Sequence, residues 1–158
     1  MCKNIVIASD HAGVNLKDKI KKFLYGRDYT VTDLGACNNC SVDYPEYAYK
    51  LIEEFYKEKL DYGILICGTG IGMDMAANRF PGIRAVNCSD PYSAKMSRSH
   101  NNANILCLGE RILGEGIAIS IVETFLNTAF EGGRHKRRID QIDEISINYW
   151  KNYLGRFA

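Results

Sequence analysis

Short apolar runs alternate with amphipathic stretches along most of the chain. The apolar runs predict five strands, at residues 5–8, 29–34, 62–67, 83–87 and 105–108. The amphipathic stretches predict helices, at residues 14–25, 45–59, 73–78, 91–100 and 117–130. Strands separated by helices need crossover connections, which favour a parallel sheet covered on both faces. We therefore expect a single α/β domain over residues 1–158, a three-layer αβα sandwich around a five-stranded, Rossmann-like parallel sheet.

A further amphipathic pattern, from residue 134 to about residue 154, predicts a long terminal helix. Its apolar stripe consists of Ile139, Ile142, Ile145, Tyr149, Trp150 and Tyr153. Such a stripe is more typical of a packing surface than of a cofactor site. We expect this helix to pack on a partner subunit.

Composition and charge exclude several classes of protein. Lysine and arginine number 20 against 19 acidic residues, so the net charge of +1 gives no reason to expect nucleic acid or a membrane as partner. The first apolar run is too short for a signal peptide or a membrane span. The six cysteines lie in an ordinary globular composition, which suits reduced thiols. We expect a cytoplasmic protein.

The third predicted strand ends in Cys67 and continues into Gly68, Gly70 and Gly72. Glycines at this spacing let several backbone N–H groups surround one anion. The dinucleotide fingerprint would need glycine at position 73, which is Met73, and the nucleotide phosphate loop would need a Gly-Lys-Ser/Thr sequence that is absent. A smaller ligand is expected, such as a carboxylate, a sugar phosphate or a developing oxyanion.

Candidate chemistry follows the predicted strands, because ligands of parallel sheets bind beyond the carboxyl ends of the strands. Asp10 and His11 follow the first strand, Cys67 ends the third, and His100 ends the helix after the fourth. We expect both histidines near this edge. Taken alone, Cys67 is more typical of a buried apolar side chain, and Asp10 is equally typical of a helix cap, but a thiol beside clustered N–H groups can act as a base or nucleophile.

Two further patterns carry candidate chemistry. Arg134 and Arg138 lie one turn apart on the predicted terminal helix, where two guanidinium groups can bind a phosphate, although a charge run is more often a solvated face. Cys37 and Cys40 form a C-x-x-C pair. Without a second such pair or paired histidines, a loop with two incidental thiols is a better interpretation than zinc or dithiol chemistry.

Six motifs in sequence order resemble the ribose-5-phosphate isomerase type B family. They are Ser9-Asp10-His11-Ala12-Gly13, Asp43-Tyr44-Pro45, Ile66-Cys67-Gly68-Thr69-Gly70-Ile71-Gly72, Gly82-Ile83-Arg84-Ala85, Ser97-Arg98-Ser99-His100-Asn101 and Glu131-Gly132-Gly133-Arg134-His135. The resemblance implies an enzyme that interconverts ribose 5-phosphate and ribulose 5-phosphate in the non-oxidative pentose phosphate pathway. It also implies no metal, no cofactor, and a homodimer or dimer of dimers with active sites shared between subunits.

The resemblance further implies a role for each matched residue. Cys67 is the base that removes the proton from C2 of the open-chain aldose and returns it to C1; some family members have a glutamate base instead. Thr69 and the amides of residues 68–72 stabilise the enediolate, and His100 opens the furanose ring with help from Asp10. The implied substrate-binding residues are Asp10, His11, Tyr44, Gly68, Thr69, Gly70, Ile71, Gly72, Asn101, Arg111, Arg134 and Arg138, of which His11, Arg111, Arg134 and Arg138 bind the phosphate.

Two alternatives stay open. A hexose 6-phosphate isomerase of the same family, acting on allose or galactose 6-phosphate, differs only in the distance from phosphate site to base. A protein that binds sugar phosphates without catalysis is the second. It has no need of both a proton-transferring thiol and a ring-opening histidine.

Overall fold

Five strands form one parallel sheet in the order β2-β1-β3-β5-β4. The structure is a computed structural model that describes residues 3–153. The strands are β1 (Lys3–Ser9), β2 (Tyr29–Asp33), β3 (Tyr62–Cys67), β4 (Ala85–Asn87) and β5 (Ile105–Gly109). The helices are α1 (Val14–Leu24), α2 (Tyr44–Lys57), α3 (Ile71–Ala77), α4 (Pro91–Asn101), α5 (Glu115–Asn127) and α6 (Arg134–Tyr153), with a 3-10 turn at His11–Gly13.

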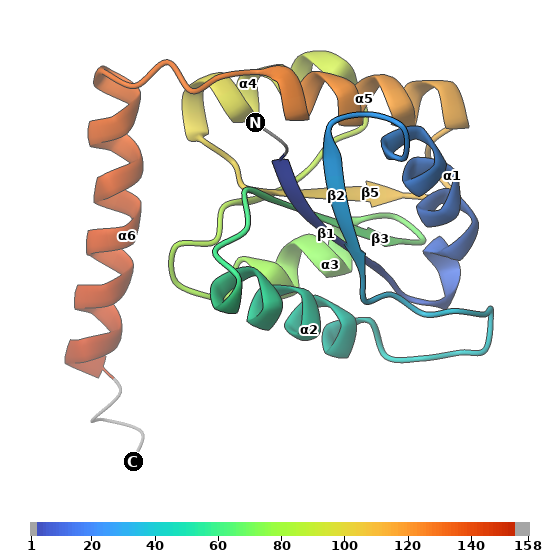
Figure 1. The fold of residues 1–158 in the computed structure, drawn as a ribbon. Helices are drawn as coiled ribbons and strands as arrows, with labels where there is room; N and C mark the ends of the chain where they lie inside the picture. Colours follow the sequence, from blue (N-terminus) through green and yellow to red (C-terminus); the bar gives the residue numbers. More distant parts are fainter. Residues whose placement is uncertain (1–2, 154–158) are drawn as a thin grey trace.

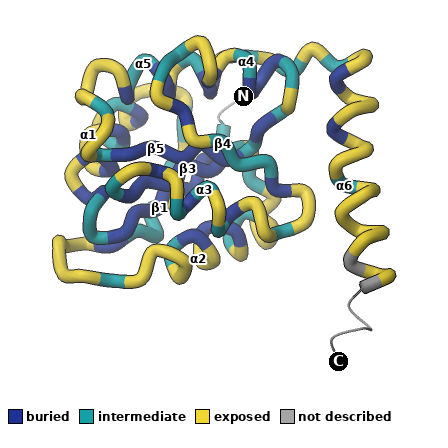
Figure 2. The backbone as a smooth tube through the Cα atoms, turned by 180° about the vertical axis from the view of Figure 1, so that it is seen from behind, coloured by how far each residue is buried: buried dark blue, intermediate teal, exposed yellow. Residues whose placement is uncertain are grey.

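Helices cover both faces of the sheet, so the predicted three-layer α/β sandwich is confirmed (Figure 1). Side chains that alternate along the strands divide the core into two clusters. Ile5, Ile7 and Ile64 pack with buried residues of α1, α4 and α5, whereas Val6 and Leu65 pack with buried residues of α2 and α3. The central strands are therefore buried on both faces (Figure 2), as expected for a parallel sheet.

The strand order reverses between β1 and β3. The chain leaves β1 for β2 on one side, then returns across the sheet to β3 on the other. The connections that follow β1 and β3 therefore diverge, and the space between them at the carboxyl ends is where open α/β sheets bind ligands. This topology places Asp10, directly after β1, beside Cys67 at the end of β3.

Most element boundaries differ from the sequence-based expectations by one or two residues, and at three elements the structure shows what replaces the expected boundary. Helix α3 begins at Ile71 rather than at residue 73, because Gly70 adopts a left-handed conformation (φ 80°) directly before it. Residues 83 and 84 precede β4, since the amide of Ile83 bonds to the carbonyl of Phe80 in a turn. Helix α5 runs from Glu115 to Asn127, so residues 128–130 connect it to the next segment.

An ion network fixes the loop after β2 against the carboxyl edge. Buried Lys17 donates to Asp33 at 3.0 Å and to the carbonyl of Ala36 at 2.8 Å, and Lys21 donates to the other Asp33 oxygen at 2.6 Å. The amide of Gly35 also donates to Asp33. Burial alone would raise the pKa of Asp33, but these hydrogen bonds hold that pKa below its usual range.

Helix α6 lies beyond the amino ends of the strands, on the side of the sheet away from the carboxyl edge (Figure 1). It contacts α4, and its Asp143 pairs with Arg84 at 3.7 Å. A groove of about 610 Å³ lies between residues 78–83 and this helix. Ile139 is buried, whereas Ile142 and Ile145 are 57% and 69% exposed. The side chains of Trp150 and Tyr153, and residue 154, lie outside the described residues.

Within the described part of the chain, no helix is both long and apolar enough to cross a membrane.

Candidate active site

The loop between β3 and α3 surrounds the thiol of Cys67. Cys67 is the last residue of β3 and is 6% exposed. The amide of Gly70 donates a hydrogen bond to its sulfur at 3.1 Å. Gly70 can do so because its φ is positive, and a Cβ at this position would lie 2.3 Å from Oδ1 of Asn87. The loop thus holds a sulfur atom and a hydrogen-bond donor in direct contact.

Two other buried thiols have a different environment. Burial raises the pKa of Cys88 to about 12, and burial raises the pKa of Cys107 well above its usual value. Both groups stay protonated near neutral pH and behave as small apolar side chains. Among the buried cysteines of the described residues, Cys67 alone lies at the end of a strand with a glycine amide on its sulfur.

Asp10 and His11 lie beside this loop, as predicted. The amide of Asp10 bonds to the carbonyl of Ile66 at 3.2 Å, and its carboxylate accepts from the amide of Ala12 at 2.8 Å. Burial raises the pKa of Asp10, and the Ala12 hydrogen bond opposes this shift. His11 accepts from the amide of Val42 at Nδ1, over 3.2 Å. The neutral ring then carries its proton on Nε2, where it can donate to an anion.

Arg111 and Tyr44 complete the rim of the same edge. The amide of Arg111 bonds to the carbonyl of Gly68 at 3.0 Å, and its guanidinium covers Gly68, where an added Cβ would lie 3.4 Å from Cζ. The ring of Tyr44, the first residue of α2, lies against Gly72, where an added Cβ would lie 3.0 Å from the ring. The structure therefore brings Asp10, His11, Tyr44, Cys67, the loop of residues 68–72 and Arg111 together in one chain.

Two residues at this edge are absent from the sequence-based prediction. Asn87, the last residue of β4, donates from Nδ2 to the carbonyl of Thr69 at 3.2 Å. Glu110, directly after β5, accepts from the side chain of Asn15 and from the amide of Leu16. Both positions directly end or follow a strand, so the rule that selected Asp10 and Cys67 could have selected them too.

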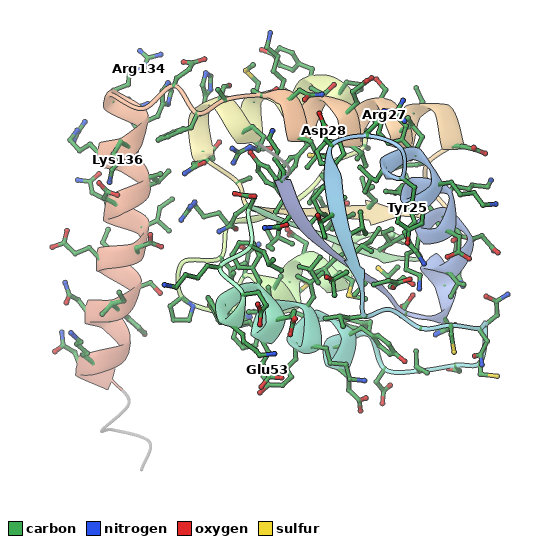
Figure 3. The ribbon with its side chains drawn as sticks, in the orientation of Figure 1. Tyr25, Arg27, Asp28, Glu53, Arg134 and Lys136 are labelled. Carbon is green, nitrogen blue, oxygen red and sulfur yellow. The ribbon has the colours of Figure 1, made fainter. Side chains whose placement is uncertain are left out.

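His100 does not lie at this edge, and the expectation that both histidines do so is wrong for a single chain. Helix α4 runs antiparallel to the strands, so its last turn, with His100 and Asn101, lies at the amino ends. The paired length of β3 and β5 alone separates the two edges by about 13 Å. Arg134 and Arg138 lie in the first turns of α6, the helix that contacts α4; Figure 3 shows Arg134 at the start of this helix.

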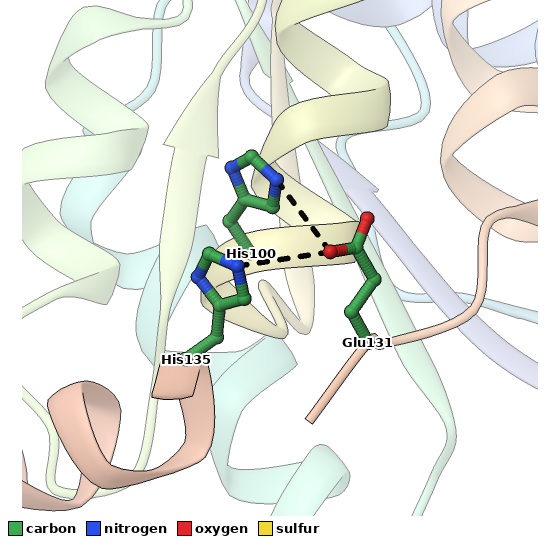
Figure 4. A group of neighbouring side chains, drawn as sticks. All are labelled: His100, Glu131 and His135. Atoms are coloured by element: carbon green, nitrogen blue, oxygen red, sulfur yellow. Dashed lines mark ion pairs between the residues drawn. The ribbon is translucent and has the colours of Figure 1, made fainter. Parts of the chain in front are cut away.

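His100 belongs to a second cluster, with Glu131 and His135 (Figure 4). One donor atom from each residue lies within 4.8 Å of the others, so the three side chains could hold a divalent cation. This is the one group of three potential ligands among the described residues, and it does not include the exposed Cys37 or Cys40.

Fold and site together define an α/β protein with a glycine loop and a thiol at the strand switch point. The chain belongs to the ribose/galactose isomerase family, whose model matches residues 5–142.

Relatives with high similarity cover nearly the whole chain. The ribose-5-phosphate isomerase B of Escherichia coli is 45% identical over 143 residues, 90% of this chain and 96% of the relative. The solved ribose-5-phosphate isomerase B of Clostridium thermocellum superposes with a TM-score of 0.89 at 51% identity, over 92% of this chain and 99% of that one. The Mycoplasma genitalium enzyme, solved with bound ribulose 5-phosphate, gives a TM-score of 0.87 at 43% identity, over 92% and 97% of the two chains.

Proposed function

We propose that this protein is an aldose-ketose isomerase that interconverts ribose 5-phosphate and ribulose 5-phosphate. The observation that carries the proposal is Cys67, a thiol at the switch point that accepts the amide of Gly70 inside a glycine loop. Isomerisation through an enediolate needs one base and hydrogen-bond donors directed at the developing oxyanion. The membership in the ribose/galactose isomerase family supports the same reaction.

In the proposed reaction, the Cys67 thiolate removes the proton from C2 of the open-chain aldose. The electron pair moves into the C1–C2 bond while the carbonyl π electrons move to O1, which forms the enediolate. The thiol then returns the proton to C1 while the C2 hydroxyl gives its proton to O1, so that C2 becomes the ketone and C1 carries the hydroxyl. Amides of residues 68–72 stabilise the oxyanion, and Thr69 at the exposed tip of the loop orients it.

Two copies of the chain are needed to complete a site in this proposal. Cys67 and His100 lie at opposite edges of one sheet, so the ring-opening histidine reaches a given thiol only from a partner subunit. The exposed Ile142 and Ile145 of α6, and the exposed Ile71 and Ile112 at the carboxyl edge, offer apolar surface for such a contact. A homodimer with two shared sites follows from this arrangement.

The phosphate is bound from both subunits in this arrangement. His11 and Arg111 come from the subunit that supplies Cys67, whereas Arg134 and Arg138 come from the partner's α6. Tyr44 lies beside Gly72 near the sugar, and Asn101 accompanies His100. Phosphate binding far from the reacting carbons fixes their orientation. A few basic side chains at the site are enough to bind the phosphate, so the protein needs no large positive net charge.

The thiols support a cytoplasmic location for the proposed enzyme. The five cysteines among the described residues are free, as is usual in a reducing compartment.

The test is an assay of the purified protein with ribose 5-phosphate, in which ribulose 5-phosphate is measured. Allose 6-phosphate and galactose 6-phosphate are assayed in parallel, because the family description covers both ribose and galactose isomerases. Turnover of the pentose with the highest kcat/KM supports the proposal. Preference for a hexose phosphate would contradict the proposed substrate. Binding of these sugars without turnover of any of the three would contradict the proposed catalytic activity.

A further inference from the structure

The turn before α6 is tied to the end of α4. The amide of Glu131 donates to the carbonyl of Ser99 at 3.0 Å, which places Glu131 beside the next residue along α4, His100. Gly132 and Gly133 then take positive φ values of 68° and 55°, and the amide of His135 bonds back to the carbonyl of Gly132 at 3.0 Å. This reversal brings Glu131 and His135, four positions apart, to the same imidazole.

The imidazole rings of His100 and His135 are stacked, and one carboxylate oxygen of Glu131 lies near both rings (Figure 4). The ring centroids of His100 and His135 are 4.2 Å apart, with an angle of 4° between the ring planes. Oε2 of Glu131 lies 3.8 Å from Nε2 of His100 and 3.7 Å from Nε2 of His135. The His135 side chain is 10% exposed and that of His100 is 37% exposed, so His100 is the ring that a ligand can reach.

The charges around His135 favour its neutral form. Burial lowers the pKa of His135, and the positive charges of His100 and Arg134 lower it further. Its Nε2 accepts from Nε of Arg134 at 3.4 Å, as a neutral ring does. Among the described residues, Glu131 is the one carboxylate within ion-pair distance of His100. The His100 ring therefore has a carboxylate beside it and the His135 ring stacked on its face.

We propose that Glu131 and His135 are positioning residues for His100: the Glu131 carboxylate orients the imidazole and stabilises its protonated form, and the neutral His135 ring fixes its plane. This inference rests on the proposed function. In the ring-opening step the C1–O4 bond breaks, His100 gives its proton to O4, and the C1 hydroxyl gives its proton to the Asp10 carboxylate of the other subunit. Exchange with water then restores both groups. A carboxylate beside an imidazole promotes such proton transfers because it orients the ring and stabilises the imidazolium.

The chemistry of the two sugars allows ring opening to be measured separately from proton transfer. Ribose 5-phosphate closes to a furanose through O4. Ribulose 5-phosphate forms no such ring, because closure from C2 would use O5, which carries the phosphate. Consumption of ribose 5-phosphate therefore needs His100 and Cys67, whereas exchange of the C1 proton of ribulose 5-phosphate with deuterium from the solvent needs only Cys67.

The test compares both rates in Glu131→Gln, His135→Ala and His135→Phe, with Glu123→Gln on α5 as the matched control. For Glu131→Gln and His135→Ala we expect ribose 5-phosphate consumption to fall by about 10-fold to 100-fold, while deuterium exchange stays within about 2-fold of the wild type. His135→Phe, which keeps a flat ring, restores part of the lost consumption. Glu123→Gln leaves both rates unchanged.

Other outcomes overturn the inference. An equal fall in both rates, with a normal melting temperature, means that the two residues act on proton transfer or substrate binding instead. No fall in either rate means that they have no role. Loss of activity in EDTA that Zn²⁺ restores means that the three side chains are metal ligands. A wild type that does neither reaction contradicts the proposed function itself.

Discussion

The amide N–H of Gly70 is directed at the sulfur of Cys67 across 3.1 Å. This contact joins a backbone conformation that only glycine adopts easily to a buried thiol that ends a strand at the carboxyl edge. The loop conformation and the reactivity of the thiol are therefore expected to change together.

Replacement of Cys67 by serine tests the thiol. A serine hydroxyl is a far weaker acid than a thiol, so little alkoxide is available, and we expect kcat for ribose 5-phosphate to fall by about 1,000-fold. Cys40→Ser, at an exposed cysteine of the C-x-x-C pair, is the matched control and should keep wild-type activity. A Cys67→Ser variant with more than a tenth of the wild-type rate would refute the role of the thiol.

Replacement of Gly70 by alanine tests the loop. The new Cβ would lie 2.3 Å from Oδ1 of Asn87 at a φ of 80°, so the loop must move and the amide loses its position at the sulfur. We expect a fall in kcat of about 100-fold with a smaller change in KM. Gly116→Ala in α5 is the control, because nothing lies within 4 Å of its added Cβ. It should keep activity and raise the free energy of unfolding by about 0.5 kcal/mol.

Complementation tests whether two chains share a site. Cys67→Ser and His100→Asn chains, each inactive alone, are unfolded and refolded together in equal amounts. Each mixed dimer contains one intact site, so the mixture should recover about one quarter of the wild-type activity. Each variant refolded alone is the control. No recovery, in a mixture shown by mass spectrometry to contain mixed dimers, would place both residues in a site built from one chain.

The pairing of Asp33 with Lys17 and Lys21 predicts a dependence of stability on pH. Hydrogen bonds lower the folded-state pKa of Asp33 despite its burial, so its contribution is present above the unfolded-state pKa of about 3.9 and is lost as pH falls through the folded-state value. Asp33→Asn should lower the free energy of unfolding by about 2 kcal/mol near pH 7, because buried Lys17 loses its counter-charge.

Urea unfolding of wild type and Asp33→Asn near pH 7 and near pH 3 measures this effect. The difference between the two proteins should shrink at the lower pH. An equal difference at both pH values would show that the carboxylate charge is not responsible.

Much of the fold could be predicted because burial imposes a visible period on the sequence. Strand β3 has the predicted bounds, Tyr62–Cys67, since its run is apolar on both faces and ends at a glycine. Boundaries set by single backbone conformations were less accessible. The start of α3 at Ile71 depends on the left-handed Gly70, and sequence alone does not say which glycine of the loop takes that conformation.

Some residues of the candidate site could also be placed from the sequence, whereas others could not. Asp10 and Cys67 could be placed from the rule about strand ends, because each directly follows or ends a strand. His100 could not be placed by that rule, since it ends a helix, and a helix between parallel strands runs back to the amino edge. The contacts of Glu131 and His135 with His100 depend on two consecutive left-handed glycines, which the sequence permits but does not specify.

Main-chain hydrogen bonds connect the three loops of the carboxyl edge. The amide of Asp10 bonds to Ile66, that of Glu110 to Cys67 and that of Arg111 to Gly68. None of these bonds depends on the identity of a side chain. Substitution at a rim position such as 44 can therefore change the surface that faces a ligand without rebuilding the scaffold, so one backbone frame can diversify over evolution.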